Sequence, residues 1–199
     1  MNYAIIGSGK EGQALAKAFA RQGLEVAIAS RRTVEELAPV AKAIGPTIIP
    51  KSLQDAVKAD VILLAIPFGT QKEIAKAAES WQGKIVIDVT NAYGVAPEEL
   101  GNLPSSVVIS QAFPGAKLVK AFNSLAAEVL AQDPNVKGGK RVVFLSSDDE
   151  GGAAQVASLV EQLGFAPVQL GKLAEGGLLI QARGKTWAQL IFQDFVKFK

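Results

Sequence analysis

Short apolar runs alternate with segments of helical periodicity along most of this chain. The runs are bounded by glycine, proline or polar residues, as is typical of buried strands. The predicted strands are Tyr3–Ile6, Val26–Ala29, Thr47–Ile49, Val61–Ile66, Lys84–Val89, Lys117–Phe122, Arg141–Leu145 and Phe165–Leu170. Val61–Ile66 is the most apolar run. We expect it at the centre of the sheet, because strands covered on both faces lose polar alternation.

The segments between these strands carry apolar residues at helical spacing. The predicted helices are Lys10–Gln22, Val34–Ile44, Leu53–Lys58, Gln71–Ser80 and Gly152–Leu163. Strands that alternate with helices of this length form a parallel sheet through right-handed crossovers. The sequence therefore predicts an α/β fold with a doubly wound, mostly parallel sheet and helices on both faces.

The chain is predicted to divide into a domain over residues 1–172 and a short C-terminal helical extension over residues 173–199. Within the extension, Trp187, Leu190, Ile191 and Phe195 fall on one helical face. Such a face packs on the sheet of its own chain or on a second copy of the chain. The pattern therefore allows a homodimer without requiring one.

A glycine-rich loop follows the first predicted strand and opens the first predicted helix. It consists of Gly7, Ser8, Gly9, Lys10, Glu11 and Gly12 and matches the pattern G-x-G-x-x-G. In this position the first glycine makes a tight turn, the second lets the backbone approach a pyrophosphate, and the third lets the helix pack closely on the strand. The pyrophosphate then lies on free amides at the helix N-terminus. The loop predicts a Rossmann-type dinucleotide site, and glycines that merely close a turn are the alternative.

The end of the second predicted strand discriminates between cofactors. NAD-specific domains usually place Asp or Glu here, to accept hydrogen bonds from the ribose 2′-hydroxyl. This chain has Ser30, Arg31 and Arg32 instead. Guanidinium and hydroxyl groups bind a 2′-phosphate through charge-assisted hydrogen bonds. The sequence therefore predicts NADPH rather than NADH, the alternative being two arginines that only keep a loop solvated.

Two further strand ends are predicted to face the same crevice, because ligands of open α/β sheets bind beyond the carboxyl ends of the strands. The fourth predicted strand ends in Ala65, Ile66, Pro67 and Phe68, of which Phe68 would flank the ribose or the nicotinamide. The fifth is followed by Asn91, which offers a side-chain amide. A Pro67 that only turns the chain and an Asn91 that only forms an Asx-turn fit the pattern equally well.

Composition narrows the chemistry and the partners. The 199 residues include no His and no Cys, which excludes disulfides, the common zinc sites and Ser-His or Cys-His nucleophiles, so we predict no metal. The formal net charge is +2 and no basic stripe with interleaved aromatics is present, so we expect no nucleic-acid partner. No apolar run is long enough to span a bilayer. Because strand-like sequence begins at Tyr3, we expect no leader before it. We therefore expect a cytoplasmic protein with no membrane contact.

Taken together, these motifs resemble those of a known family, the NADPH-dependent deazaflavin reductases, also called coenzyme F420-dependent NADP oxidoreductases. The motifs that carry the resemblance are Gly7–Gly12, Ser30–Arg32, Ile66–Phe68 and Lys120–Asn123. The resemblance runs over residues 1–172, and the cytosolic reductase domains of certain membrane metalloreductases are related to the same family. It implies that the first motif binds the pyrophosphate, that the second holds the 2′-phosphate and that the third lines the nicotinamide.

The resemblance also implies that Ala121, Phe122 and Asn123 border a second, flavin-like cofactor beside the nicotinamide. From the residues alone, this segment would be a strand end with an N-capping Asn. The tail Gly176–Lys199 differs from the usual C-terminal segment of the archaeal enzymes, which helps form the deazaflavin pocket and the dimer contact. The transmembrane haem domain of the metalloreductases has no counterpart, so the resemblance does not imply their activity.

The missing residue types bear on mechanism. An enzyme that reduces a carbonyl needs a group that moves the hydroxyl proton, but Tyr3 lies in the first strand and Tyr93 is followed by Pro97 where a Lys would be needed. Hydride transfer between two ring cofactors needs mainly positioning, at about 3–3.5 Å. We therefore expect an NADP-dependent oxidoreductase that passes hydride to F420, FMN or FAD without an acid or base residue. Two alternatives stay open: a carbonyl or imine reductase with Lys117 or Lys120 as the acid, and a non-catalytic NADPH sensor or scaffold.

Overall fold

A computed structural model of the chain describes residues 1–182 and 194–198, and its central element is a twisted sheet. The main path of the sheet follows the order β10-β8-β6-β5-β4-β1-β2-β3, and β7 and β9 pair with β8 off this path. The strands are β1 Tyr3–Ile6, β2 Val26–Ala29, β3 Ile48–Pro50, β4 Val61–Leu64, β5 Ile85–Asp88, β6 Lys117–Ala121, β7 Asn135–Val136, β8 Gly139–Ser147, β9 Ala166–Gln169 and β10 Val196–Lys197. Strands β1 to β6 are all parallel, which gives the order 3-2-1-4-5-6 of a Rossmann fold.

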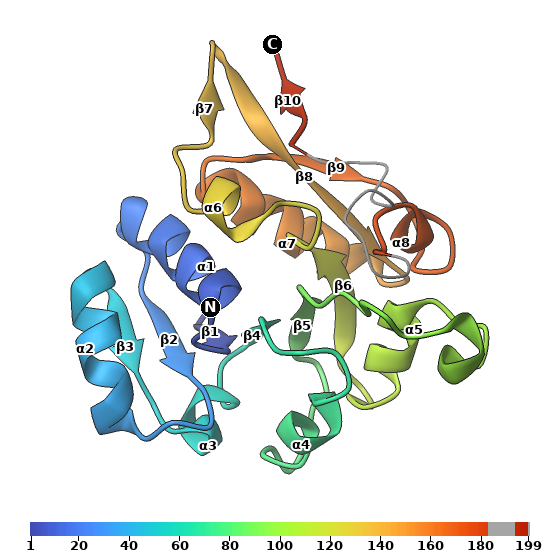
Figure 1. Cartoon of the computed structure of the whole chain (residues 1–199), viewed down its shortest axis with the longest axis horizontal. Coiled ribbons are helices and arrows are strands. Elements are labelled where there is room, and N and C mark those ends of the chain that lie inside the picture. Colours follow the sequence, from blue (N-terminus) through green and yellow to red (C-terminus); the bar gives the residue numbers. More distant parts are fainter. Residues whose placement is uncertain (183–193, 199) are drawn as a thin grey trace.

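Helices cover both faces of this sheet. They are α1 Lys10–Arg21, α2 Val34–Ile44, α3 Leu53–Ala56, α4 Gln71–Ala75, α5 Ser105–Ser110, α6 Ala127–Leu130, α7 Glu150–Gln162 and α8 Gly176–Leu179, with a 3₁₀ turn, η1, at Pro97–Leu100. Helices α1, α6 and α7 lie on one side of the strands, and α3, α4 and α5 lie on the other (Figure 1). The predicted doubly wound, mostly parallel α/β fold is confirmed.

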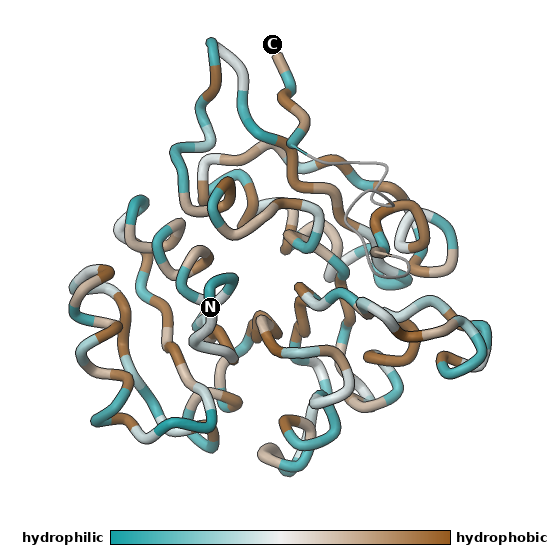
Figure 2. Tube along the Cα trace, viewed as in Figure 1, coloured by the Kyte–Doolittle hydropathy of each residue, from teal (hydrophilic) through white to brown (hydrophobic). Residues whose placement is uncertain are grey.

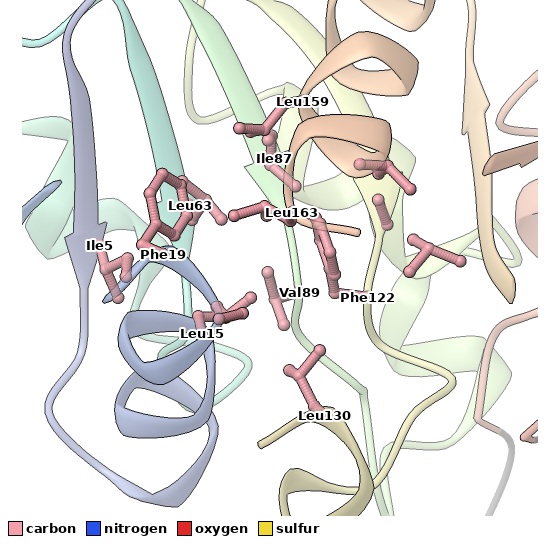
Figure 3. Packing of buried hydrophobic residues seen from close by; sticks show 14 of the residues in the cluster. Ile5, Leu15, Phe19, Leu63, Ile87, Val89, Phe122, Leu130, Leu159 and Leu163 are labelled. Carbon is pink, nitrogen blue, oxygen red and sulfur yellow. The ribbon is translucent and has the colours of Figure 1, made fainter. Parts of the chain in front are cut away.

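The two hydrophobic cores follow from the alternation of side chains along each strand. In β4, Leu63 contributes to the core under α1 and α7, whereas Ile62 and Leu64 contribute to the core under α3, α4 and α5. Figure 2 shows hydrophobic stretches along the central strands, and polar and apolar residues mixed along the helices that cover them. Phe19 and Leu15 of α1 anchor the first core together with strand residues (Figure 3).

Helix boundaries follow local capping chemistry. The side-chain hydroxyl of Thr33 accepts from the backbone N–H of Glu36 at 3.3 Å, and the carboxylate of Glu36 accepts from the N–H of Thr33 at 2.8 Å. This reciprocal capping box satisfies two free donors at the start of α2, which therefore begins where the sequence predicts. Helix α4, by contrast, ends at Ala75 and not at Ser80 as predicted. The backbone carbonyl of Ala75 accepts a hydrogen bond from the indole N–H of Trp81 at 2.9 Å, and the chain turns there toward β5.

The carboxyl-terminal part departs from the prediction in two ways. The strand predicted at Arg141–Leu145 is the longer β8, and it runs antiparallel to β6. Most of the predicted tail helix, including Trp187, lies outside the described residues. At the described end, residues 196–197 form a strand and not a helix, because their backbone groups pair with the free edge of β8. Phe195 thus lies beside this edge strand, with its ring 5.7 Å from that of Phe144.

A buried ion pair joins β5 to β6 at their carboxyl ends. The ammonium of Lys120 lies 3.1 Å from the carboxylate of Asp88, and both side chains have no exposed surface. The carboxylate also accepts from the hydroxyl of Ser106 at 2.7 Å and from the N–H and hydroxyl of Thr90 at 2.9 and 2.7 Å. Lys120 also donates to the backbone carbonyl of Thr90 at 3.0 Å. The network fixes the loop that leaves β5, since each polar group in it has a partner.

Removing one partner of this pair should destabilise the fold strongly. Lys120→Met leaves the buried Asp88 carboxylate uncompensated, so we expect a loss of about 3–5 kcal/mol in the free energy of unfolding. Lys58→Met is the matched control, because its pair with Asp55 is solvent-exposed and should contribute less than about 1 kcal/mol. Urea denaturation of both variants checks the difference, and equal losses would contradict it. Asp88→Asn combined with Lys120→Met should recover part of the loss.

Candidate cofactor site

A cavity of about 320 Å³ opens at the carboxyl edge of the sheet, where β1, β2 and β4 end. It is lined by Ile6, Gly7, Ser8, Gly9, Ser30, Arg31, Arg32, Ala65, Ile66, Pro67, Thr70 and Ile74. The strand order changes direction beside β1, because β2 follows on one side and β4 on the other. Ligands of open α/β sheets bind at such a switch point. The cavity therefore lies where the fold itself predicts a site.

The glycine loop has room for side chains at only one of its three glycines. A Cβ on Gly7 would lie 2.0 Å from the carbonyl oxygen of Ala65, and a Cβ on Gly12 would lie 1.9 Å from that of Gly7. Gly9 differs, since a Cβ there would meet nothing within 4 Å. Gly9 is also the N-cap of α1 and offers no side-chain hydrogen bond to it. The free amides of the first helical turn are thus available to an anion that approaches over Gly9.

The end of β2 presents hydroxyl and guanidinium groups beside this loop. The hydroxyl of Ser8 donates to that of Ser30 at 3.2 Å, and the same Ser30 oxygen accepts from the backbone N–H of Arg32 at 3.1 Å. Arg31 forms an ion pair with Glu73 of α4, with 2.8 Å between Nη2 and Oε2, and both side chains are largely exposed. Glu73 therefore pairs with Arg31 from outside the lining of the cavity, through a contact that solvent screens.

The ends of β5 and β6 are tied together by two asparagines. The amide of Asn91 donates to the backbone carbonyl of Asn123 at 2.9 Å, and the amide of Asn123 donates to the side-chain oxygen of Asn91 at 3.1 Å. Between Ala121 and Asn123, Phe122 adopts a left-handed φ of 65°, which is a strained conformation for a residue with a large side chain. This turn brings Asn123 back over the end of β5.

The predicted site residues fall into two groups. Those that line the cavity together are Gly7, Ser8, Gly9, Ser30, Arg31, Arg32, Ala65, Ile66 and Pro67. Those that do not line it are Lys10, Glu11, Gly12, Phe68, Asn91, Ala121, Phe122 and Asn123. Phe68 packs against the core under α4. The side chains of Ala121 and Phe122 are fully buried, and Phe122 points into the first core beside Leu163 (Figure 3), so these two side chains do not border an open site.

Neither lysine proposed as an acid reaches the cavity. Lys120 is fully buried in its pair with Asp88. Lys117 begins β6, at the opposite edge of the sheet, and lies 3.5 Å from Asp149. Within the described residues, none of the side chains that line the cavity is a carboxylate or a lysine, and no cluster of His, Cys, Asp or Glu could hold a metal ion.

Three residues in α4 or directly before it were not predicted to belong to the site. Thr70 and Ile74 line the cavity, and Glu73 holds Arg31. The available signal is their position, since they follow Pro67 at the carboxyl end of a central strand. Nothing in the residue types themselves indicates a site, because a Thr before a helix and an Ile on its apolar face are ordinary helix features.

Glu11 lies beside the cavity, in the first turn of α1, and its carboxyl faces α6. The pKa of Glu11 is raised to about 7. Burial is the main cause and the nearby Glu128 carboxylate adds to it, while a hydrogen bond from the backbone N–H of Ala127 lowers the pKa. Tyr93, which follows β5, lies close enough to be affected: burial and the Glu11 carboxylate raise the pKa of its hydroxyl, and Asn91 opposes them.

Comparison with known proteins agrees with this geometry. The model of the family described as NADP oxidoreductase coenzyme F420-dependent matches residues 2–92. Metalloreductase STEAP2 of Mus musculus is 30% identical over 172 residues, which are 85% of this chain and 33% of that protein. The human protein is 29% identical over the same length. The chain thus spans about a third of the length of the curated relatives it matches.

Solved structures extend the similarity beyond the matched segment. A hypothetical protein of Sinorhizobium meliloti has a TM-score of 0.90 and 40% identity, and the match covers 99% of this chain and 96% of that one. A putative F420-dependent NADP-reductase of Arthrobacter sp. FB24 has a TM-score of 0.72 and 27% identity, over 87% and 86% of the two chains. A reductive aminase of Aspergillus terreus in complex with NADPH has a TM-score of 0.63 and 18% identity, over 87% and 55%, and shows the same fold.

The family match and the cavity coincide in the chain. Residues 2–92 run from the start of β1 to the loop after β5, and so include all the strand ends that form the cavity. The Arthrobacter reductase shares the fold over nearly its whole length. Over these residues, the chain is similar to the coenzyme F420-dependent NADP oxidoreductases.

Proposed function

We propose that this protein transfers hydride between NADP(H) and a deazaflavin or flavin acceptor. The observation that carries the proposal is the cavity in which the glycine loop meets Ser30, Arg31 and Arg32. Its free amides and its two guanidinium groups suit a nucleotide with both a pyrophosphate and a 2′-phosphate. The absence of Asp or Glu at the end of β2 favours NADP(H) over NAD(H).

The sheet order determines how the cofactor would lie. The 2′-phosphate would meet the arginines after β2, and the pyrophosphate would lie over Gly9 at the start of α1. The nicotinamide would then extend past Ile66 and Pro67 toward the ends of β4 and β5. When bound, the cofactor supplies the hydride, while the residues of the chain bind and orient its two ends.

The surroundings of the cavity favour a ring acceptor over a carbonyl. Reduction of a carbonyl needs a proton donor at the reacting oxygen. The described residues that line the cavity offer hydroxyls, guanidinium groups and apolar side chains, and the carboxyl of Glu11 lies outside this lining. Transfer between two rings can proceed through positioning alone. A cytoplasmic location and a homodimer belong to the same proposal as predictions from the sequence. Within residues 1–182 and 194–198, every helix is too short or too polar to cross a membrane.

Loss of both arginines should weaken NADPH selectively. In Arg31→Ala/Arg32→Ala, we expect the Kd for NADPH to rise about 100-fold, because charge-assisted hydrogen bonds to the 2′-phosphate are lost. The Kd for NADH should change less than about threefold, since it lacks that phosphate. Isothermal titration calorimetry with each nucleotide measures both. Lys42→Ala/Lys140→Ala removes the same charge from exposed positions and should change neither Kd. Equal weakening of NADPH and NADH in the arginine variant would contradict the assignment.

A methyl group on Gly9 should separate binding from folding. Gly9→Ala has space for its Cβ and an extended backbone with φ −75°, so its melting temperature should stay close to that of the wild type. Its Kd for NADPH should rise about tenfold or more, because the methyl group lies where the pyrophosphate must approach the backbone. Gly12→Ala should instead lower the melting temperature, since its Cβ would overlap the Gly7 carbonyl. Unchanged NADPH binding in Gly9→Ala would place the pyrophosphate elsewhere.

A panel of acceptors tests the reaction itself. We expect NADPH to be oxidised in the presence of coenzyme F420, FMN, FAD or riboflavin, with one acceptor clearly preferred, as followed by the loss of nicotinamide absorbance. The arginine double variant should slow this turnover at low NADPH concentration and approach the wild-type rate at saturation. Tight NADPH binding without turnover of any acceptor would overturn hydride transfer and favour an NADPH sensor. Turnover of a small imine alone would favour the imine reductase alternative.

A further inference from the structure

Glu11 is a member of the glycine motif that does not line the cavity. It lies between Gly9 and Gly12 in the first turn of α1, and its carboxyl turns away from the cavity, toward α6 and the loop after β5. One of its oxygens, Oε2, is enclosed and has no hydrogen-bond partner among the described residues. An enclosed, unsatisfied carboxyl oxygen is costly in a folded protein, so it calls for an explanation.

The topology places Glu11 on the nicotinamide side of α1. The arginines that would hold the 2′-phosphate follow β2, on one side of β1, whereas Tyr93 follows β5, on the other side. Glu11 interacts with Tyr93 and with Glu128 of α6, and both lie on the β5 and β6 side. A dinucleotide anchored at Gly9 must direct its nicotinamide half toward this second side. Glu11 is therefore the carboxyl group of the motif that this half approaches.

The charge of that half changes with its redox state. An oxidised nicotinamide ring carries a positive charge, and the reduced ring is neutral. A carboxylate beside the ring favours the oxidised form, whereas a protonated carboxyl makes no such distinction. Two groups face Glu11, the carboxylate of Glu128 and the hydroxyl of Tyr93. The Glu128 carboxylate lies 3.9 Å from the ammonium of Lys10. The Tyr93 hydroxyl stays neutral near neutral pH, because its pKa is raised. This environment lets Glu11 gain or lose a proton near neutral pH.

We propose that Glu11 couples the redox state of the bound nicotinamide to one proton. Beside the reduced ring the carboxyl holds the proton, and beside the oxidised ring it releases the proton to solvent and compensates the new positive charge. When hydride leaves the cofactor, the ring gains one positive charge and Glu11 gains one negative charge as its proton goes to solvent, so the net charge of the site does not change. The inference rests on the proposed binding of NADP(H) in this cavity.

The ratio of two dissociation constants tests the coupling without any turnover. Kd is measured for NADP⁺ and for NADPH by calorimetry between pH 5.5 and 8.5. We expect the Kd for NADP⁺ to fall about tenfold relative to the Kd for NADPH as the pH rises. A tenfold change is expected when the pKa of Glu11 differs by one unit between the two complexes. The 2′-phosphate also titrates, but it is common to both nucleotides and cancels in the ratio. The chain has no His that could mimic the effect.

Three variants distinguish Glu11 from its surroundings. Glu11→Gln keeps the shape and should make the ratio independent of pH. Glu128→Gln removes a repelling charge and should move the midpoint of the transition to lower pH, a shift that a purely structural role of Glu11 would not produce. Glu161→Gln, on the exposed face of α7, should leave the wild-type transition unchanged.

The outcomes that overturn the inference differ from those that overturn the proposed function. A wild-type ratio that does not change with pH, or a Glu11→Gln ratio that still changes, refutes the coupling while NADP(H) binding stands. If neither nucleotide binds, the proposed cofactor site fails, and the coupling fails with it.

Discussion

The chain turns from β1 into α1 through a space that admits almost no side chain. The carbonyl of Gly7 occupies the position that a Cβ on Gly12 would need, and the carbonyl of Ala65 blocks Gly7 in the same way. This close approach brings the start of α1 against the ends of β1 and β4, and it aims the free amides of the helix at the cavity. The position of the cavity, and of each group that lines it, depends on this contact.

A second constraint fixes the far side of the site. The buried pair of Asp88 and Lys120 costs free energy to desolvate, and it is tolerated because Ser106 and Thr90 satisfy the remaining oxygens. The pair holds the ends of β5 and β6 together, shortly before Asn91 and Asn123. The amide of Asn91 donates to the backbone carbonyl of Asn123, and the amide of Asn123 donates to the side-chain oxygen of Asn91. These polar residues thus hold the ends of β5 and β6 in a fixed geometry.

The sequence was most informative where a pattern is local. The period of apolar residues located β1 to β6, β8 and β9, whereas β7 and β10 were not predicted. The start of α2 agrees with the prediction, and the Thr33–Glu36 capping box lies there. The glycine loop and the arginines meet in one cavity because parallel strands end at one edge. The antiparallel direction of β8 and the pairing of β10 could not be predicted in this way, because both depend on which distant strand edge is free.

The same limit explains the predicted site residues that the structure places elsewhere. Phe122 follows a strand end as Ile66 does, yet its left-handed backbone sends its ring into the core. The ion pair of Arg31 with Glu73 joins two elements whose separation in sequence gives no hint of contact. Such features arise from tertiary packing. A sequence motif predicts where a site lies in the fold, but it does not predict the direction of each side chain.

The charges around α1 are arranged along the direction in which a dinucleotide would lie. Arg31 and Arg32 stand on the β2 side, the free amides of the helix lie in the middle, and Glu11 and Glu128 stand on the β5 and β6 side. An oxidised NADP has the matching order, with its 2′-phosphate at one end, its pyrophosphate in the middle and its cationic ring at the other end. Complementarity of this kind fixes orientation and register more than it adds affinity. A field with this polarity would therefore determine which end of a bound dinucleotide meets the acceptor, and the proposed hydride transfer depends mainly on such positioning.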